Sequence, residues 1–369
     1  MKRILVFLLA TFLFVSLAAC GAEAPAATQA TTEAPGWKLG GVALEEFTLV
    51  YSDEATFAGG TEICGKLADV AIRFSDSLFE LTGIRLEPVF EDDLEELPAH
   101  LIALGKIGAK ELRDFYKAGD WEITDYSYGM FGGQLVLMGG SVNACYFAGA
   151  DFLAAFAQQM DFSAEPVLGS HDLIRVACVG DSITEGHGTM DDGSENDRNV
   201  HTYPIYLQKL LGYEYYLANY GKGGARLTNY AQDPKYALSV KFAADWVIFM
   251  LGTNDCSPLN DQWGTDSYTA LYKDTYAHML ETYQSYNPEL KMVVMTPPSV
   301  LPSAKQKEGC KVISTYIREF SDTYGWPLVD LFTVSEEEAW VFNDHIHPQG
   351  EVYLRIAEVI YENIKDVMK

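Results

Sequence analysis

Short apolar runs separated by longer amphipathic stretches dominate the second half of the chain. The runs lie at 174–179, 214–219, 245–251, 291–296 and 327–331, and their length is typical of buried strands. The stretches between them, with apolar residues at helical spacing, lie at 201–211, 268–286, 304–324 and 350–367. Strands that alternate with such helices form right-handed crossovers and a parallel sheet covered on both faces. The pattern predicts an α/β fold whose site lies in the loops at the carboxyl ends of the strands.

The first half of the chain shows a different alternation. Apolar residues at helical spacing predict a helix over 61–82, and Gly83 ends it. Further strands are predicted at 42–52, 84–91, 100–105, 121–128 and 134–139, and further helices at 109–118 and 143–158. We therefore expect a small α/β sandwich domain over 38–168, followed by a catalytic domain over 172–369. No stretch of the first domain gathers a nucleophile, a base and an acid, so we interpret it as an accessory domain.

The N-terminus is predicted to be a targeting segment. Lys2 and Arg3 precede an apolar run over 4–19, and small residues stand directly before Cys20. This order resembles a bacterial lipoprotein signal, which implies a signal peptide over 1–20 and a lipid on Cys20. The Ala/Thr/Pro-rich residues 21–37 are expected to form a flexible linker. We predict an extracytoplasmic protein anchored to the bacterial cell membrane; an ordinary secretory signal or a short transmembrane anchor are the alternatives.

The charge and the cysteines limit the kinds of partner and ligand that we expect the protein to bind. A net charge of −26 argues against nucleic acid, whose phosphates require a basic face. The five other cysteines form no CxxC pair and have no histidine at zinc-ligand spacing, so we expect buried free thiols and no structural metal.

Four segments of the second domain carry candidate chemistry. Ser182 follows the first apolar run, within Val-Gly-Asp-Ser-Ile-Thr-Glu-Gly at 179–186. A serine hydroxyl is a weak nucleophile until a base removes its proton. The downstream segments are a Gly-rich turn at 221–224, Gly-Thr-Asn-Asp at 252–255 and Asp-His-Ile-His-Pro at 344–348, and they supply candidate oxyanion donors, a carboxylate and a base. The structural alternatives are a helix-capping serine, a tight glycine turn and an Asx turn.

These four blocks, in this order, resemble the SGNH (GDSL-type) hydrolase superfamily, serine esterases with a three-layer α/β/α fold. The resemblance implies that Ser182 is the nucleophile and that its own N–H joins the oxyanion hole. It implies that His347 is the base and Asp344 its partner, because the family spacing is Asp-x-x-His; His345 is then a loop residue. Gly224 and Asn254 match the other two oxyanion donors. Gly221 is the second choice for the glycine.

The segment after Asn254 is similar to SGNH carbohydrate O-acetylesterases of the sialate and xylan types. We predict an enzyme that removes short acyl groups, most simply acetyl, from the hydroxyls of an acylated carbohydrate, with no cofactor and no metal. A lipid-directed esterase, lysophospholipase or thioesterase is one alternative, and a non-catalytic glycan-binding surface lipoprotein is another. Trp263 is either a sugar platform or a packing residue. Asp181 and Asp255, ionised at neutral pH, are assigned structural roles.

The first domain carries a resemblance of its own. The segments at 134–141 and 151–153 look like the accessory domain that precedes the barrel in hexosaminidase-type glycoside hydrolases. This similarity implies a carbohydrate setting and does not imply a reaction.

Overall fold

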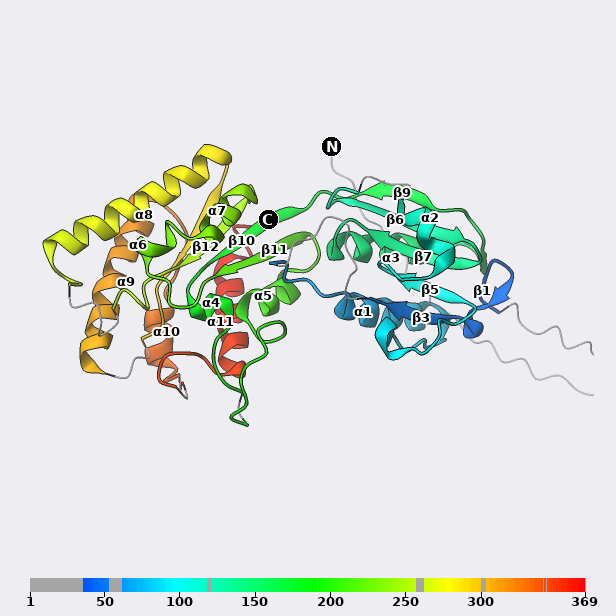
Figure 1. The fold of residues 1–369 in the computed structure, drawn as a ribbon, viewed down its shortest axis with the longest axis horizontal. Coiled ribbons are helices and arrows are strands. Elements are labelled where there is room, and N and C mark those ends of the chain that lie inside the picture. The colour runs from blue at the N-terminus through cyan, green and yellow to red at the C-terminus, as the bar shows by residue number, and fades with distance from the viewer. Residues whose placement is uncertain are drawn as a thin grey trace, which may run out of the picture. The chain divides into compact units, whose positions relative to one another are not determined.

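Five parallel strands form the sheet of the C-terminal half (Figure 1). They are β10 (Ile174–Gly180), β11 (Tyr215–Gly221), β12 (Trp246–Met250), β13 (Lys291–Met295) and β14 (Leu328–Val329). Their order in the sheet is β11-β10-β12-β13-β14. The predicted α/β class and the five parallel strands are confirmed. Because β11 and β12 lie on opposite sides of β10, the chain reverses its direction of winding there, and such a point is where open parallel sheets bind ligands.

Helices pack against both faces of this sheet, because alternate residues of each strand point to opposite faces. Val179 and Phe249 face a core shared with α6 (Leu227–Tyr230), α7 (Pro234–Lys241), α8 (Asp266–Tyr286) and α9 (Ala304–Tyr324). Cys178 and Ile248 face a second core shared with α5 (Tyr203–Leu211), α10 (Leu331–Glu337) and α11 (Gly350–Ile364). The buried strands thus leave only their ends and the loops beyond them for chemistry.

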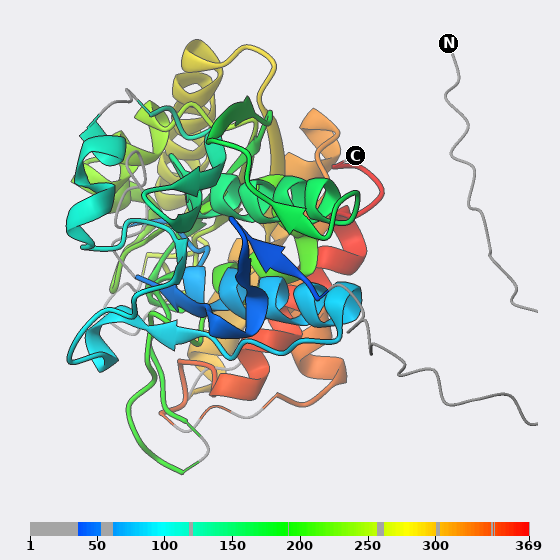
Figure 2. The same ribbon diagram turned by 90° about the vertical axis from the view of Figure 1, so that its right-hand side faces the viewer.

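A mixed sheet organises the N-terminal half, with the order β4-β3-β5-β7-β6-β9. Its strands are β3 (Thr48–Tyr51), β4 (Val89–Phe90), β5 (Leu101–Leu104), β6 (Asp125–Phe131), β7 (Gln134–Gly139) and β9 (Val167–Ser170). The helices α1 (Leu67–Thr82) and α3 (Val142–Phe156) lie side by side on one face (Figure 2). The other face packs against residues around α2 (Arg113–Lys117). An additional N-terminal α/β region is therefore confirmed; the domain limits 38–168 and 172–369 stay predictions.

The smaller elements complete the chain. Strands β1 (Lys38–Leu39), β2 (Val42–Ala43) and β8 (Asp161–Phe162) form a three-stranded sheet. Short 3-10 turns lie at Leu44–Glu46, Glu91–Asp93 and Lys110–Leu112, and α4 (Ser182–Glu185) follows β10.

The predicted helix over 61–82 is wrong at its start. The helix begins at Leu67, and its N-cap, Lys66, has an extended backbone. The Cys64 N–H donates to the Leu217 carbonyl at 3.0 Å, and the Asn219 N–H donates to the Glu62 carbonyl at 2.7 Å. This short segment therefore pairs antiparallel with the edge strand β11. Hydrogen bonds to a distant strand outweigh the helical periodicity of the sequence.

The structure, a computed structural model, describes residues 36–52, 62–117, 121–190, 192–256, 262–299, 303–340, 342 and 344–368. The predicted signal peptide, Cys20 and nearly all of the predicted linker lie outside these residues. Within the described ranges, no helix is both long enough and apolar enough to cross a membrane. Cys64, Cys145, Cys178, Cys256 and Cys310 are free and buried, as predicted.

Candidate active site

Ser182 lies at the carboxyl end of β10, next to the point where the winding reverses. It is the first residue of α4, a helix of four residues whose N-cap is Asp181. Gly180 has no room for a side chain, because a Cβ there would lie 2.0 Å from Oγ1 of Thr184 and 2.7 Å from the Met250 carbonyl. The glycine lets the strand end against α4, which fixes the position of Ser182.

A continuous chain of hydrogen bonds joins Ser182, His347 and Asp344. The Ser182 Oγ lies 2.9 Å from Nε2 of His347, and Nδ1 of the same ring lies 2.5 Å from Oδ2 of Asp344. An ionised carboxylate only accepts, so Nδ1 carries the proton and Nε2 is free to accept from the serine hydroxyl. The structure thus brings the three predicted residues together across 165 positions of sequence.

Asp344 is held in its ionised form by the loop that carries the histidine. Its Oδ1 accepts the backbone N–H of Ile346 at 2.9 Å and that of His347 at 2.7 Å. Burial acts to raise the pKa of Asp344, but these hydrogen bonds and the His347 side chain outweigh it and hold the pKa below its ordinary value. His345, the rejected candidate, adopts a φ of 69° in the same loop, which turns the chain between the carboxylate and His347.

The turn after β11 distinguishes the two candidate glycines. The Gly221 N–H donates to Oδ1 of Asn219 at 2.9 Å, and the Gly223 N–H donates to Oε2 of Glu185 at 2.6 Å. Within the part of the chain that the structure describes, the Gly224 N–H has no hydrogen-bond partner. Its φ of 72° belongs to the left-handed region that glycine adopts without strain. Gly224 therefore has a free donor, whereas the donor of Gly221 is used.

Asn254 lies in the turn after β12 and is tied to the glycine turn. Its Nδ2 donates to the Ala225 carbonyl at 3.0 Å. A side-chain amide carries two N–H groups, so one remains for a ligand. The structure thus links the turn of Gly224, after β11, to the turn of Asn254, after β12, at the carboxyl ends of the two strands that flank β10.

The two motif aspartates hold backbone in place. Asp181 accepts the Ile183 N–H at 3.0 Å, and Asp255 accepts the Leu227 N–H at 3.1 Å and the Tyr268 hydroxyl at 2.6 Å. Both carboxyls are fully buried, and burial raises the pKa of each to about 6. Their contacts are those of structural residues.

Glu185 and His187 were not predicted as site residues. The Glu185 Oε2 lies 2.9 Å from Nε2 of His187 and accepts the Gly223 N–H, while the His187 ring lies 5.5 Å from the His347 ring. Burial acts to raise the pKa of Glu185, but the hydrogen bonds from His187 and Gly223 outweigh it and lower the pKa. Glu185 stands inside the 179–186 motif, but no spacing in the sequence reveals its contact with the turn of Gly223.

Two further predictions concern Trp263 and metals. The Trp263 side chain packs against Cys310 and against the backbone of Gly309, where a Cβ would lie 2.9 Å from the indole. These contacts favour the packing alternative.

Among the described residues, no group of three or more His, Cys, Asp or Glu side chains is arranged to hold a metal ion. The prediction that no cofactor is needed stays a prediction.

Residues 178–355 match the model of the GDSL-like Lipase/Acylhydrolase family. The match confirms the prediction of a GDSL-type hydrolase for this part of the chain. An acetylxylan esterase from Xylanibacter ruminicola is 28% identical over 225 residues, which cover 53% of this chain and 44% of that protein. The chain therefore spans less than half of the length of this curated relative.

Solved esterase structures are similar to about half of the chain. A carbohydrate acetylesterase from Sinorhizobium meliloti shares 17% identity and a TM-score of 0.43, and covers 53% of this chain and 99% of its own. An acetylxylan esterase from Geobacillus stearothermophilus shares 17% identity with a TM-score of 0.41, and the match covers 52% of this chain and 94% of that protein. An aryl esterase from M. smegmatis shares 19% identity with a TM-score of 0.41, and the match covers 53% of this chain and 99% of that protein.

Proposed function

We propose that this protein is a serine esterase that removes acetyl groups from carbohydrate hydroxyls through an acyl-enzyme. The observation that carries the proposal is the hydrogen-bonded chain from Asp344 through His347 to Ser182, beside the free N–H of Gly224. A nucleophile, a base, a residue that orients the base and donors for an oxyanion are the parts that acyl transfer needs.

In the first half of the reaction, the Ser182 oxygen attacks the ester carbonyl carbon. His347 takes the serine proton on Nε2, and Asp344 stabilises the imidazolium that forms. The new C–O bond places negative charge on the former carbonyl oxygen. His347 then returns the proton to the sugar oxygen, the ester C–O bond breaks, and the sugar leaves as an alcohol.

Three donors are available to the oxyanion. They are the N–H groups of Ser182 and Gly224, neither of which has a hydrogen-bond partner among the described residues, and the second N–H of the Asn254 amide. Such donors act most strongly on charge that develops in the transition state. In the second half of the reaction, His347 removes a proton from water, the hydroxide attacks the acyl-enzyme, and acetate leaves as Ser182 regains its proton.

The substrate class is supported by the relatives rather than by the geometry. The name of the relative from Xylanibacter ruminicola is acetylxylan esterase. Separately, residues 178–355, which match the GDSL-like family model, include Ser182, Gly224, Asn254, Asp344 and His347. We propose an acetylated polysaccharide as the substrate on this ground.

Acetate release from acetylated xylan, pectin, sialoglycan and peptidoglycan tests the proposal. We expect release from at least one polymer, and Ser182→Ala should lower it by about 10³-fold or more. Ser285→Ala, a change at an exposed serine on α8, is the matched control and should leave it unchanged. Unchanged turnover by Ser182→Ala would contradict the proposal, and so would a preference for long-chain esters over acetate.

We also propose that Cys20 carries a lipid that anchors the mature protein outside the cytoplasm. The support is the basic start, the apolar run and the small residues before this cysteine. Metabolic labelling with a fatty acid tests it: the protein should take up label, and Cys20→Ser should not.

We further propose that residues 38–168, which resemble the accessory domain of hexosaminidase-type glycoside hydrolases, serve as a spacer or as a glycan-binding region.

A further inference from the structure

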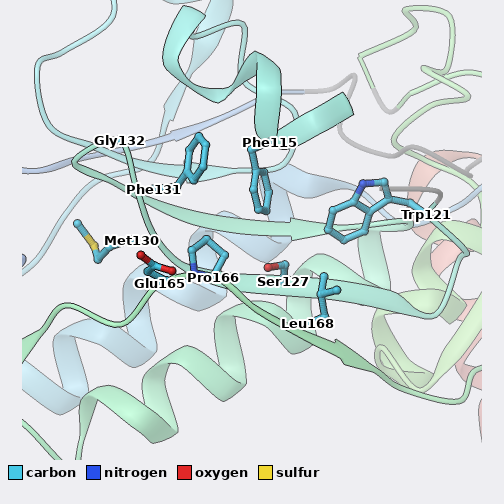
Figure 3. Close-up of a pocket in the computed structure, with 9 residues that line it drawn as sticks. All are labelled: Phe115, Trp121, Ser127, Met130, Phe131, Gly132, Glu165, Pro166 and Leu168. Atoms are coloured by element: carbon cyan, nitrogen blue, oxygen red, sulfur yellow. The ribbon is translucent and has the colours of Figure 1, made fainter. Parts of the chain in front are cut away.

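The N-terminal α/β region contains a cavity of about 590 Å³ that the proposed reaction does not use (Figure 3). None of the residues that line it belongs to the hydrogen-bonded chain of Ser182. Its volume is within the range of small-ligand sites, roughly 300–1,000 Å³. The cavity is large enough for at least one sugar ring.

Aromatic rings form one side of the cavity. Phe115 comes from α2, Trp121 lies before β6, and Phe131 ends β6. The Phe115 ring lies 6.2 Å from the Trp121 ring and 5.4 Å from the Phe131 ring, and all three side chains are only half-buried. The Phe115 ring plane is tilted by 60° from that of Trp121 and by 46° from that of Phe131, so each ring offers its own apolar face. The C–H face of a pyranose ring is the natural complement of such a face.

The cavity is also lined by a buried hydroxyl, that of Ser127 (Figure 3). Ser127 and Phe131 point to the same face of the sheet because they are four residues apart on β6. Ser127 is 0% exposed, and its Oγ has no hydrogen-bond partner within the described ranges. Leu168, its cross-strand neighbour on β9, is 80% exposed and borders the same cavity. A buried hydroxyl without a partner costs stability, and a ligand hydroxyl would satisfy it.

The charge at the cavity selects among ligands. Glu165 is exposed and lines the cavity, and the whole protein carries a net charge of −26. A carboxylate accepts hydrogen bonds from sugar hydroxyls but repels uronic and sialic acids. A tetraalkylammonium ion would also suit aromatic rings beside a carboxylate, but it has no hydrogen-bonding group that could pair with Ser127.

We propose that this cavity is a glycan-binding site for a neutral pyranose residue. The sugar packs its C–H face on one ring of the cluster of Phe115, Trp121 and Phe131, with the other two rings beside it. One hydroxyl pairs with Ser127, and another donates to Glu165. This site binds the polymer without reacting with it, and its existence does not depend on the activity of Ser182.

Affinity electrophoresis of the full chain in gels that contain xylan, mixed-linkage β-glucan or galactomannan tests the proposal. The Ser182→Ala variant serves as the parent, so that esters are not consumed. We expect retardation by at least one of these neutral polymers. Trp121→Ala should lower the association constant at least tenfold, and Ser127→Ala should lower it severalfold. Ser127→Ala removes no hydrogen bond from the free protein, so its melting temperature should not fall.

Ser314→Ala is the matched control, because Ser314 is also fully buried with an unpartnered hydroxyl but does not line the cavity. It should bind as the parent does. The proposal is overturned if none of the three polymers retards the protein, or if Ser127→Ala and Trp121→Ala bind as tightly as Ser314→Ala. Glu165-dependent binding of tetramethylammonium in place of neutral glycan would also overturn it, and so would a preference for polygalacturonate.

Discussion

The two large sheets of this chain position polar groups in different ways. In the C-terminal sheet all five strands are parallel, so their carboxyl ends meet at one edge, and Ser182 and Asn254 follow two neighbouring strands there. In the N-terminal sheet β6 runs antiparallel to β7 and β9, so amino and carboxyl ends share each edge. Its cavity lies against a face of the sheet, beside Ser127, and not at the strand ends.

The difference shows what each topology is suited to. A parallel sheet brings loops from distant parts of the chain to one place, so a nucleophile and its donors can converge without long insertions. A mixed sheet leaves part of a face open where its helices do not cover it, which suits a binding surface. The following experiments test whether the chemistry is confined to the carboxyl edge of the parallel sheet.

The largest effect is expected at His347, and almost none at His345, which is two residues away. His347→Ala should lower kcat/KM by about 10⁴-fold, because the serine loses its base. His345→Asn should stay within about threefold, because asparagine tolerates the left-handed backbone that this position adopts. Steady-state hydrolysis of an aryl acetate measures both. Equal losses in the two variants would show that the loop matters and the choice of histidine does not.

A smaller loss of activity should distinguish an asparagine at the carboxyl ends of the parallel strands from one at their amino ends. Asn254→Ala should lower kcat by about 10²–10³-fold with little change in KM, because one oxyanion donor is lost. Asn287→Ala is the matched control: its amide donates to the Ala244 carbonyl at 2.8 Å, but at the amino ends of β12 and β13. It should lower stability by about 1 kcal/mol and leave kcat unchanged. A comparable fall in kcat would contradict the idea that chemistry is confined to the carboxyl edge.

Glu185 tests how firmly the glycine turn must be held. Glu185→Ala removes the acceptor of the Gly223 N–H, so we expect kcat to fall about tenfold, or about 1.4 kcal/mol, at unchanged KM. Glu185→Gln keeps an oxygen acceptor at the same place and should recover most of the loss. If glutamine is as impaired as alanine, the charge of Glu185 matters and its positioning role is wrong.

The smallest effect concerns pH and stability. Burial raises the pKa of Asp181 from 3.8 to about 6, so the folded state holds this proton more tightly than the unfolded state. The contribution of Asp181 to stability is therefore complete below about pH 3.8 and is lost as pH rises towards about 6. The asparagine of Asp181→Asn does not titrate. The free energy of unfolding of this variant, relative to that of the parent, should therefore rise by up to about 3 kcal/mol as the pH increases over this range.

Urea unfolding at pH 4 and at pH 8 measures this difference. Asp76→Asn, at a carboxylate whose side chain is 54% exposed, is the control and should show no such gain. Asp344, whose pKa is lowered, has the opposite sign: its contribution is present above its unfolded pKa and is lost as pH falls through the folded value. A gain for Asp181→Asn that does not depend on pH would contradict burial as the cause.

The parallel strands could be predicted because each is a short buried run between helices, a pattern that sequence alone carries. The approach of His347 to Ser182 followed from a resemblance in motif order. The preference for Gly224 over Gly221 rests on the same resemblance. The physical distinction between them could not be predicted, because it depends on which N–H groups other residues already use. The contact of Glu185 with Gly223 joins α4 to the turn after β11, and the pairing of Glu62–Cys64 with β11 joins distant segments. Neither leaves a local periodicity in the sequence.

The pairing of Glu62–Cys64 with β11 has a practical consequence for work on the C-terminal region alone. An edge strand with unpaired N–H and C=O groups invites pairing with another chain. In this protein Ile63 and its neighbours occupy part of that edge. A shortened chain that begins at residue 172 would keep Ser182, Gly224 and His347 but lose this cover. It should therefore self-associate in solution more readily than the longer chain, even where its catalytic residues are intact.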